Sequence, residues 1–256
     1  RATDRGLLVV LSNNQFVAND KISPPPMWYD TQYSEEIVVR LWNALVNRYR
    51  NQWNVFAIDL KNEPWGDATW GSSNMSSDWN KAAERMIKGM SSFIGIFFVD
   101  GVNWGLSLEY ALEYPVKTGD TNLDGRIVYT PHCYGPTVIN WKEHEVKSFQ
   151  APNFPNNLDQ KFMTRFGFLV QHDTPIVIGE WGAITDKGSV GEKWNEWYVE
   201  WIRQHCVTNN FYWSLDPSSA YSSGLLEADW LTPNPRKLHF INRAQPNPTK
   251  FELRNG

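Results

Sequence analysis

The sequence predicts an α/β fold built on a parallel sheet or barrel, and three observations support this prediction. Val55-Phe56-Ala57-Ile58 and Ile176-Val177-Ile178 are continuously apolar, as in strands that helices cover on both faces. Strand-like and helix-like segments alternate along the chain. The chain has 256 residues, which is enough to bury one large core and is an ordinary size for an α/β barrel.

The first half of the chain is expected to form three strands and two helices. Residues 7–11 form the first apolar run, and residues 34–50 follow with apolar side chains at helical spacing. Ser34 can cap this helix, and the two glutamates after it suit the positive end of the helix dipole. A second strand ends at Glu63, and a helix over 78–90 and a strand over 94–99 come next.

The second half continues the alternation. Strands are expected over 126–130, 175–178 and 210–214, and helices over 157–172 and 191–206. The Pro-rich tail from about Thr232 has weak periodicity and is expected to wrap the edge of the barrel. No linker, low-complexity tract or short repeat interrupts the sequence, so residues 1–256 are predicted to form a single catalytic domain.

Composition excludes several classes of function. The net charge of −4 comes without a basic stripe, which argues against nucleic acid as a partner. No run approaches the ~18 consecutive apolar residues of a membrane helix, so no membrane partner is expected. The chain has 14 Trp, and such enrichment fits a carbohydrate cleft as well as a Trp-rich core.

Two glutamates stand directly after strand-like runs, Glu63 in Ile58-Asp59-Leu60-Lys61-Asn62-Glu63-Pro64 and Glu180 in Pro175-Ile176-Val177-Ile178-Gly179-Glu180-Trp181-Gly182. Active sites of parallel sheets and barrels collect at this end of the strands. A pair of carboxylates is the minimum equipment of a glycosidase. The alternative for either glutamate alone is an ion pair or a helix cap at the end of a strand.

The two cysteines, Cys133 and Cys206, cannot form a disulfide framework and have no metal-ligand spacing. Cys206 falls on the apolar stripe of the helix expected over 191–206, which predicts a buried, inert thiol. Cys133 follows His132, but neighbouring residues of a strand point to opposite faces, which argues against a catalytic pair. No metal-binding cluster is visible, so neither a metal nor a cofactor is expected.

Four motifs, taken together and in order, resemble glycoside hydrolase family 5, and more narrowly its bacterial-type endo-β-1,4-glucanases. They are Asn62-Glu63-Pro64, His132-x-Tyr134, Glu180-x-Gly182 and Trp213. The resemblance extends from Gly6 to Trp230. It implies a (β/α)8 TIM barrel that hydrolyses β-glucan polysaccharides or oligosaccharides with retention. It also implies a secreted, extracellular protein.

The resemblance implies separate roles for the site residues. Glu63, at the end of the fourth barrel strand, is expected to be the general acid/base, and Glu180, at the end of the seventh, the nucleophile. Asn62 is expected to hydrogen-bond the 2-OH of the sugar. His132 and Tyr134 are expected to line the site, with the tyrosine hydroxyl holding the nucleophile. The alternative for the histidine is a structural role at a strand end.

Substrate binding is assigned to further residues that resemble the family or lie in expected loops. Trp213 matches the platform under the sugar that is cleaved, although a core role is the alternative. Trp28, Trp181 and Asn14 are also expected to bind substrate. Some tryptophans at the same strand ends and loops are expected to stack sugars at flanking subsites: Trp28, Trp65, Trp70, Trp104, Trp141 and Trp181.

The chain departs from the family pattern in two places. Only about six of the eight βα units are visible, and the first two have no counterpart. Either the chain is a fragment of a longer protein, or a second chain or a missing segment completes the barrel; the lack of an initiator Met fits a processed or partial polypeptide. Asn14 occupies the slot where relatives usually have a histidine, and an amide binds hydroxyls but does not carry a proton.

Three functions remain open at this stage. A secreted retaining endo-β-1,4-glucanase is favoured. A β-mannanase or another β-glucanase of the same family is the second. A non-catalytic carbohydrate-binding remnant is the third, and the missing units and Asn14 are the reasons to keep it.

Overall fold

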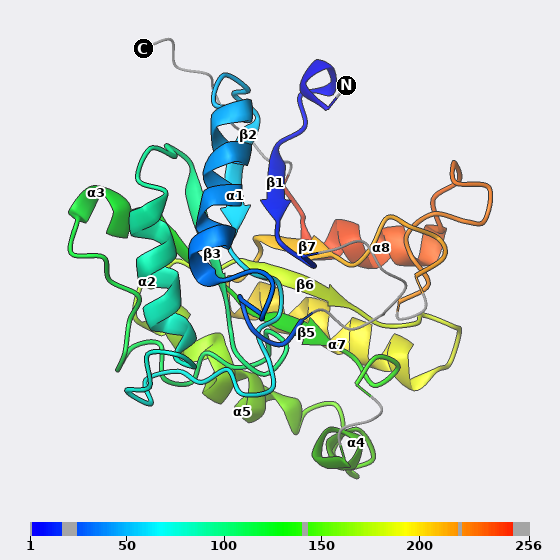
Figure 1. Ribbon diagram of the computed structural model, residues 1–256. Helices are drawn as coiled ribbons and strands as arrows, with labels where there is room; N and C mark the ends of the chain where they lie inside the picture. Colours follow the sequence, from blue (N-terminus) through cyan, green and yellow to red (C-terminus); the bar gives the residue numbers. More distant parts are fainter. Residues whose placement is uncertain (1, 17–24, 140–142, 220–221, 248–256) are drawn as a thin grey trace. The chain divides into compact units, whose positions relative to one another are not determined.

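The computed structural model describes residues 2–16, 25–139, 143–219 and 222–247 (Figure 1). The chain divides into two compact units. Unit 1 comprises Arg1–His132 and Met163–Gly179, and unit 2 comprises Cys133–Phe162 and Glu180–Gly256. The prediction of a single catalytic domain is not tested by this division and stays a prediction.

Unit 1 contains a four-stranded parallel sheet with the order β1-β2-β3-β4. Its strands are β1 (Val9–Ser12), β2 (Val55–Asp59), β3 (Ile96–Asp100) and β4 (Ile127–Thr130). The apolar runs that predicted strands therefore form them. Because all four strands run in the same direction, the residues that follow them lie together at the carboxyl ends of the strands.

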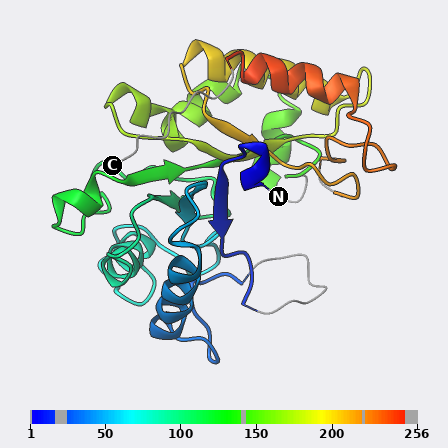
Figure 2. The ribbon, with the colours of Figure 1, turned by 90° about the horizontal axis from the view of Figure 1, so that it is seen from above.

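Helices α1 (Glu35–Tyr49) and α2 (Trp79–Gly89) lie side by side in unit 1, as Figure 2 shows. The Ser34 hydroxyl caps α1 by accepting a hydrogen bond from the backbone N–H of Ile37, as the sequence predicts. Asn43 of α1 donates to the backbone oxygen of Gly89 at 2.8 Å. A Cβ on Gly89 would lie 2.6 Å from Val39, so the close approach of the helices requires glycine there.

Helix α1 has apolar side chains on two of its faces. Its inner face buries Val38, Trp42 and Val46. A second stripe of large apolar residues remains exposed: Leu41, Leu45 and Tyr49. The helix therefore presents apolar surface to solvent as well as to the core.

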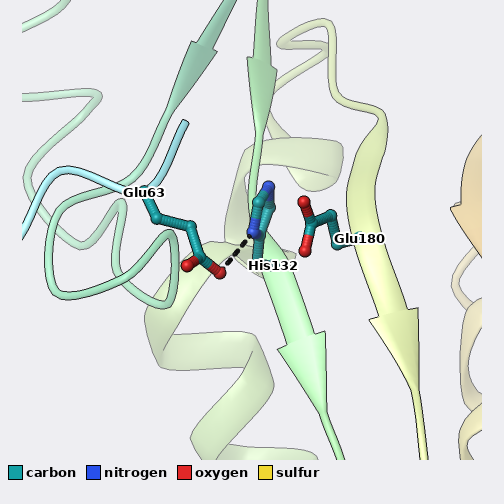
Figure 3. Close-up of side chains that lie close together, drawn as sticks. All are labelled: Glu63, His132 and Glu180. Atoms are coloured by element: carbon teal, nitrogen blue, oxygen red, sulfur yellow. Dashed lines mark hydrogen bonds and ion pairs between the residues drawn. The ribbon is translucent and has the colours of Figure 1, made fainter. Parts of the chain in front are cut away.

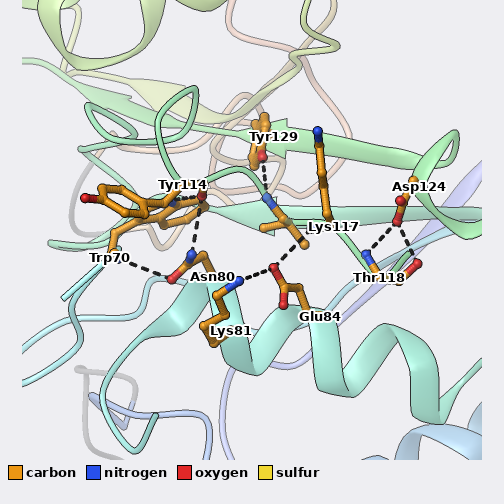
Figure 4. Close-up of polar contacts among 11 residues, drawn as sticks. Trp70, Asn80, Lys81, Glu84, Tyr114, Lys117, Thr118, Asp124 and Tyr129 are labelled. Carbon is orange, nitrogen blue, oxygen red and sulfur yellow. Dashed lines mark hydrogen bonds and ion pairs between the residues drawn. The ribbon is translucent and has the colours of Figure 1, made fainter. Parts of the chain in front are cut away.

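Hydrogen bonds attach the segment between β3 and β4 to helix α2, as Figure 4 shows. The Trp70 indole and the Asn80 amide both donate to the backbone oxygen of Tyr114. Glu84 of α2 accepts from the backbone N–H of Lys117 at 3.2 Å. The described residues of unit 1 also form four shorter helical segments: Thr3–Arg5, α3 (Thr121–Asp124), the π-helical turn Met163–Gly167 and α6 (Phe168–Gln171).

The second sheet has the order β5-β6-β7, with β5 at His132–Tyr134, β6 at Ile178–Gly182 and β7 at Asn210–Tyr212. The boundary between the units falls within β5 and within β6. Unit 2 has four helices in the part of the chain that is described: α4 (Glu143–Phe149), α5 (Leu158–Phe162), α7 (Val190–Gln204) and α8 (Pro235–Ala244).

Aromatic side chains form the core of unit 2. Tyr198 of α7 stacks on Trp194 with the ring centroids 4.6 Å apart, and it also contacts Trp181. These three rings are fully buried. The structural alternative for the abundant tryptophans, a Trp-rich core, therefore accounts for several of them.

One helix was not predicted, and one expectation about local structure is wrong. The tail from Thr232 contains helix α8, which begins after Asn234; the Asn234 side chain accepts from two backbone N–H groups and Pro235 occupies the first turn. Cys206 is exposed, because α7 ends at Gln204 and the cysteine adopts a left-handed backbone with φ of 58°. Among the described residues, no helix is long and apolar enough to cross a bilayer.

Candidate active site

Glu63 follows β2, at the carboxyl ends of the strands of the unit 1 sheet. Its φ of 53° is left-handed, which is costly for a residue with a Cβ and must be held by its surroundings. The backbone N–H of Glu63 donates to the Asp100 carboxylate at 2.9 Å. The Glu63 side chain is half-buried, and its Oε1 lies 2.9 Å from Nδ1 of His132 (Figure 3). The structure therefore brings together Glu63 and His132, both predicted from the sequence.

His132 sits in a narrow slot between two glycines of unit 1. A Cβ on Gly105 would lie 2.7 Å from Cγ of the imidazole, and a Cβ on Gly179 would lie 2.9 Å from its Nε2. The backbone N–H of His132 also donates to the oxygen of Gly105. The ring is thus fixed from both sides, and only its two nitrogens are available for polar contacts.

Buried charges lie beneath Glu63, and sequence reasoning missed them as site residues. Asp100 is the last residue of β3, Asp59 is the last residue of β2, and Lys61 is fully buried. Burial raises the pKa of the Asp59 carboxyl well above its ordinary value, and the nearby Asp100 charge raises it further. Burial lowers the pKa of the Lys61 ammonium to about 8. The negative charges of Asp59 and Asp100 act in the opposite direction and raise this pKa.

A signal for these residues exists in the sequence. Asp59 and Asp100 each end an apolar strand, which is the feature that identified Glu63 and Glu180. The Lys61 ammonium donates a short hydrogen bond to the backbone oxygen of Asn62. Asn62 is itself buried, and its backbone N–H donates to Asn13. Asn14 lies beyond β1 with an exposed side chain.

Glu180 lies within β6, in unit 2. The Tyr134 hydroxyl donates a very short hydrogen bond to Oε2 of Glu180. Tyr134 is buried at the end of β5, so its phenol is held in place and the carboxylate that it contacts is oriented. This pair was predicted from the sequence, and the structure brings it together.

Trp213 follows β7 and keeps 36% of its surface exposed. Its backbone N–H donates to the oxygen of Trp181 at 2.9 Å. A partly exposed indole ring offers an open face on which an apolar surface, such as one face of a sugar ring, can stack.

The assignments of Trp28 and Trp181 to substrate binding are wrong, because both side chains are fully buried. The Trp28 indole donates to Glu35 at 2.7 Å and its ring lies against Trp79. The Trp181 indole donates to Asn210 at 2.8 Å. Neither ring can stack on a ligand while it remains in these contacts.

The other tryptophans expected at the rim divide into three groups. Trp70 is buried, so it does not stack on a sugar. Trp65 and Trp104 are half-buried and stack on each other with centroids 4.6 Å apart. Trp141 lies outside the described residues.

Unit 2 contains an open pocket of about 430 Å³, formed by the loops that follow β6 and β7 and by the start of α8. Its lining is mostly polar and includes Thr185, Asp186, Lys187, Glu227 and Arg236. Pockets of this volume commonly hold small ligands.

Comparison with known proteins places this geometry in a family. Residues 2–219 match the family model described as cellulase, glycosyl hydrolase family 5. The chain belongs to glycosyl hydrolase family 5. This membership confirms the resemblance that the four motifs gave, and with it the prediction of an α/β fold of the TIM-barrel class.

Relatives with curated descriptions are similar along nearly the whole chain. An endoglucanase from Paenibacillus polymyxa is 33% identical over 263 residues, covering 95% of this chain and 62% of the relative. The major extracellular endoglucanase from Xanthomonas campestris pv. campestris is 31% identical over 255 residues, covering 93% of this chain and 49% of the relative. The chain thus spans about half to two thirds of the length of these relatives.

Solved structures are also similar. The catalytic domain of the major endoglucanase from Xanthomonas campestris has a TM-score of 0.85 at 28% identity, covering 96% of this chain and 71% of that chain. A complex of endocellulase from Pyrococcus horikoshii with cellotetraose has a TM-score of 0.83 at 30% identity, with 95% and 71% covered. The prediction that a second chain or a missing segment completes the barrel stays a prediction.

Proposed function

We propose that this protein is a retaining endo-β-1,4-glucanase. The observation that carries the proposal is that each of the two glutamates is held by a side chain of its own unit, Glu63 by His132 and Glu180 by Tyr134. Membership of family 5 and the endoglucanase descriptions of the relatives support it. Since the chain spans only part of those relatives, the activity of the whole protein is an inference.

The first step of the proposed reaction forms a covalent intermediate. A carboxylate oxygen of Glu180 attacks the anomeric carbon, and the bond from that carbon to the glycosidic oxygen breaks. Glu63 gives its proton to this oxygen, which leaves as the hydroxyl of the departing glucan. Glu180 is then esterified to the remaining sugar.

The second step reverses these roles. Glu63, now ionised, takes a proton from water, and the water oxygen attacks the anomeric carbon. The bond to Glu180 breaks, which frees its carboxylate and restores the proton on Glu63. Two inversions at one carbon give net retention. A retaining mechanism requires the two carboxyl groups to be ~5 to 5.5 Å apart.

Neighbouring residues are proposed to bind the sugar. The Asn62 side chain would hydrogen-bond the 2-OH, a contact that strengthens in the transition state. The exposed face of Trp213 would support the sugar that is cleaved, and Asn14 would bind a hydroxyl. The proposed substrate is a β-glucan polysaccharide or oligosaccharide. Such polymers are too large to enter a cell, so we also propose secretion.

The decisive experiment replaces each glutamate by glutamine. Glu63→Gln and Glu180→Gln should each reduce activity on cellotetraose by about 10³-fold or more, because one lacks a proton donor and the other lacks a nucleophile. Glu36→Gln, an exposed residue at the start of α1, is the matched control and should retain full activity. A wild-type protein that leaves cellotetraose intact would instead support a carbohydrate-binding remnant.

The choice of polysaccharide is tested separately. We expect release of reducing ends from carboxymethylcellulose to exceed release from glucomannan or mixed-linkage β-glucan. Faster cleavage of glucomannan would show a β-mannanase, and faster cleavage of the mixed-linkage polymer would show another β-glucanase.

A further inference from the structure

Asp100 is a buried carboxylate in direct contact with the residues that hold Glu63. It ends strand β3 and only 1% of its surface is exposed. Its Oδ1 accepts a hydrogen bond from the Thr130 hydroxyl. Its Oδ2 accepts the backbone N–H of Glu63 at 2.9 Å and lies 3.3 Å from Nε2 of His132. The carboxylate therefore contacts the acid/base glutamate twice, once through the backbone and once through the imidazole.

The contact with Asp100 determines which nitrogen of His132 carries a proton. An ionised carboxylate only accepts hydrogen bonds, so Nε2 must be protonated. In the neutral imidazole, Nδ1 then has a free lone pair directed at Glu63 Oε1, 2.9 Å away. This lone pair accepts a hydrogen bond from Glu63 when Glu63 is the protonated acid.

Asp100 also stabilises the backbone that directs Glu63. The left-handed φ of 53° at Glu63 is unfavourable for a residue with a Cβ. The Asp100 carboxylate satisfies the Glu63 N–H in this conformation. Trp79 anchors Asp100 in turn, because its indole donates to the Asp100 backbone oxygen at 2.9 Å.

The charged groups around Asp100 belong to two strands, β2 with the residues that follow it and β5. Asp59 is the last residue of β2, and Lys61 and Glu63 follow it in the chain. His132 is the first residue of β5. Burial raises the pKa of the Asp100 carboxyl, and the attraction of His132 and the hydrogen bonds from Glu63 and Thr130 oppose this effect. These contacts favour the ionised form of Asp100, whereas burial disfavours it.

We propose that Asp100 is a positioning residue for Glu63, acting on the acid/base through the His132 ring and the Glu63 backbone. This inference rests on the proposed function. Asp100 touches no substrate, and its effect is confined to the proton transfers that Glu63 performs.

The test compares two substrates that differ in their need for an acid. Cellotetraose has a sugar leaving group that must be protonated, whereas the leaving group of 2,4-dinitrophenyl β-cellobioside departs without a proton. Asp100→Asn keeps the size of the side chain but removes its charge and its obligatory acceptor. We expect kcat/KM to fall by about 10 to 100-fold for cellotetraose and by less than about threefold for the dinitrophenyl substrate.

The split between kcat and KM gives a second readout. Hydrolysis of the intermediate still needs Glu63 as a base, so for the dinitrophenyl substrate kcat and KM should both decrease in Asp100→Asn while their ratio is nearly constant. A general loss of folded protein lowers the apparent kcat alone. Thr130→Val, which removes only the hydroxyl donor to Asp100, should show the same pattern at smaller size, and it remains informative if Asp100→Asn does not fold.

Asp78→Asn is the matched control. Asp78 is also 1% exposed, and it accepts hydrogen bonds from Thr69 and Ser72 at the start of α2. Its loss should reduce stability and leave the ratio of the two kcat/KM values at the wild-type level. Equal losses on both substrates in Asp100→Asn, or none on either, would overturn the proposal for Asp100. A wild-type protein inactive on both substrates would instead overturn the proposed function.

Discussion

The Tyr134 hydroxyl and the Glu180 carboxylate form a very short hydrogen bond between β5 and β6. The phenol is buried, so the donor has little freedom to move away. The bond holds the Glu180 carboxylate in place through Oε2. This is the arrangement that an attacking carboxylate needs.

Tyr134→Phe should lower kcat on cellotetraose by about 10 to 100-fold, because a hydrogen bond to a charged group is worth about 1.5 to 3 kcal/mol. The ring and its packing remain. Tyr129→Phe is the control: the Tyr129 hydroxyl accepts the backbone N–H of Val116 within unit 1, so its loss should affect stability and not kcat. Equal kcat values for wild type and Tyr134→Phe would show that the bond has no catalytic role.

Gly105→Ala should displace His132, because the new Cβ would lie 2.7 Å from the imidazole. Activity should fall at least tenfold, in addition to a stability loss of about 1 to 2 kcal/mol from a left-handed alanine. Gly119→Ala has the same backbone penalty at φ of 82°, but its Cβ meets nothing within 4 Å. Urea unfolding and assays of both variants would separate the two effects, and an equal loss of activity in both would contradict the role of the slot.

The buried Lys61 makes stability depend on alkaline pH. Its pKa is about 8 in the folded protein and 10.5 as an ordinary lysine, so between these values the unfolded chain binds more protons. Both states are protonated below about pH 8, where the cost of burying the ammonium is fully present. The free energy of unfolding should therefore rise from about pH 8 to 10.5, by roughly 3 kcal/mol relative to Lys61→Met.

The Lys61 prediction is measured by urea unfolding of both proteins across this pH range. Tyrosines also begin to ionise there, and the comparison with Lys61→Met cancels their contribution. Parallel pH curves for the two proteins would show that the ammonium titrates at the same pH in the folded and unfolded states.

Trp213 and Trp181 should respond differently to substitution. Trp213→Ala removes an exposed ring, so kcat/KM on cellotetraose should fall by about 30-fold, equivalent to about 2 kcal/mol, with a small change in Tm. Trp181→Phe removes the buried hydrogen bond to Asn210 and should cost about 1 to 3 kcal/mol of stability. Calorimetry and kinetics on the two variants test this, and a Trp213→Ala protein with normal kinetics would contradict its role as a platform.

The sequence predicted the strands and the two glutamates because both depend on local pattern. A continuous apolar run followed by a charge is visible at Glu63 and Glu180, and the structure places both where the runs end or just beyond. The same pattern at Asp100 was available, but its contacts with Glu63 and His132 join residues far apart in the chain. Pairings of that kind depend on strand order and register, which a single sequence does not contain.

Burial explains the errors among the tryptophans. Trp28 follows an Asn- and Pro-rich stretch and Trp181 follows Glu180, and both were expected at the open end of the strands. Successive residues of a strand point to opposite faces, so Trp181 points away from the side that presents Glu180 and enters the core of unit 2. Helix α8 was missed because its apolar positions are few, although its Asn234-Pro235 start was readable.

The exposed stripe of helix α1 has a practical consequence for handling the protein. Leu41, Leu45 and Tyr49 form a ridge of apolar surface, and β1 is at the edge of its sheet. Apolar ridges and open strand edges both favour association between copies of a chain. Solubility is therefore expected to limit concentrated preparations of this chain before the stability of its core does.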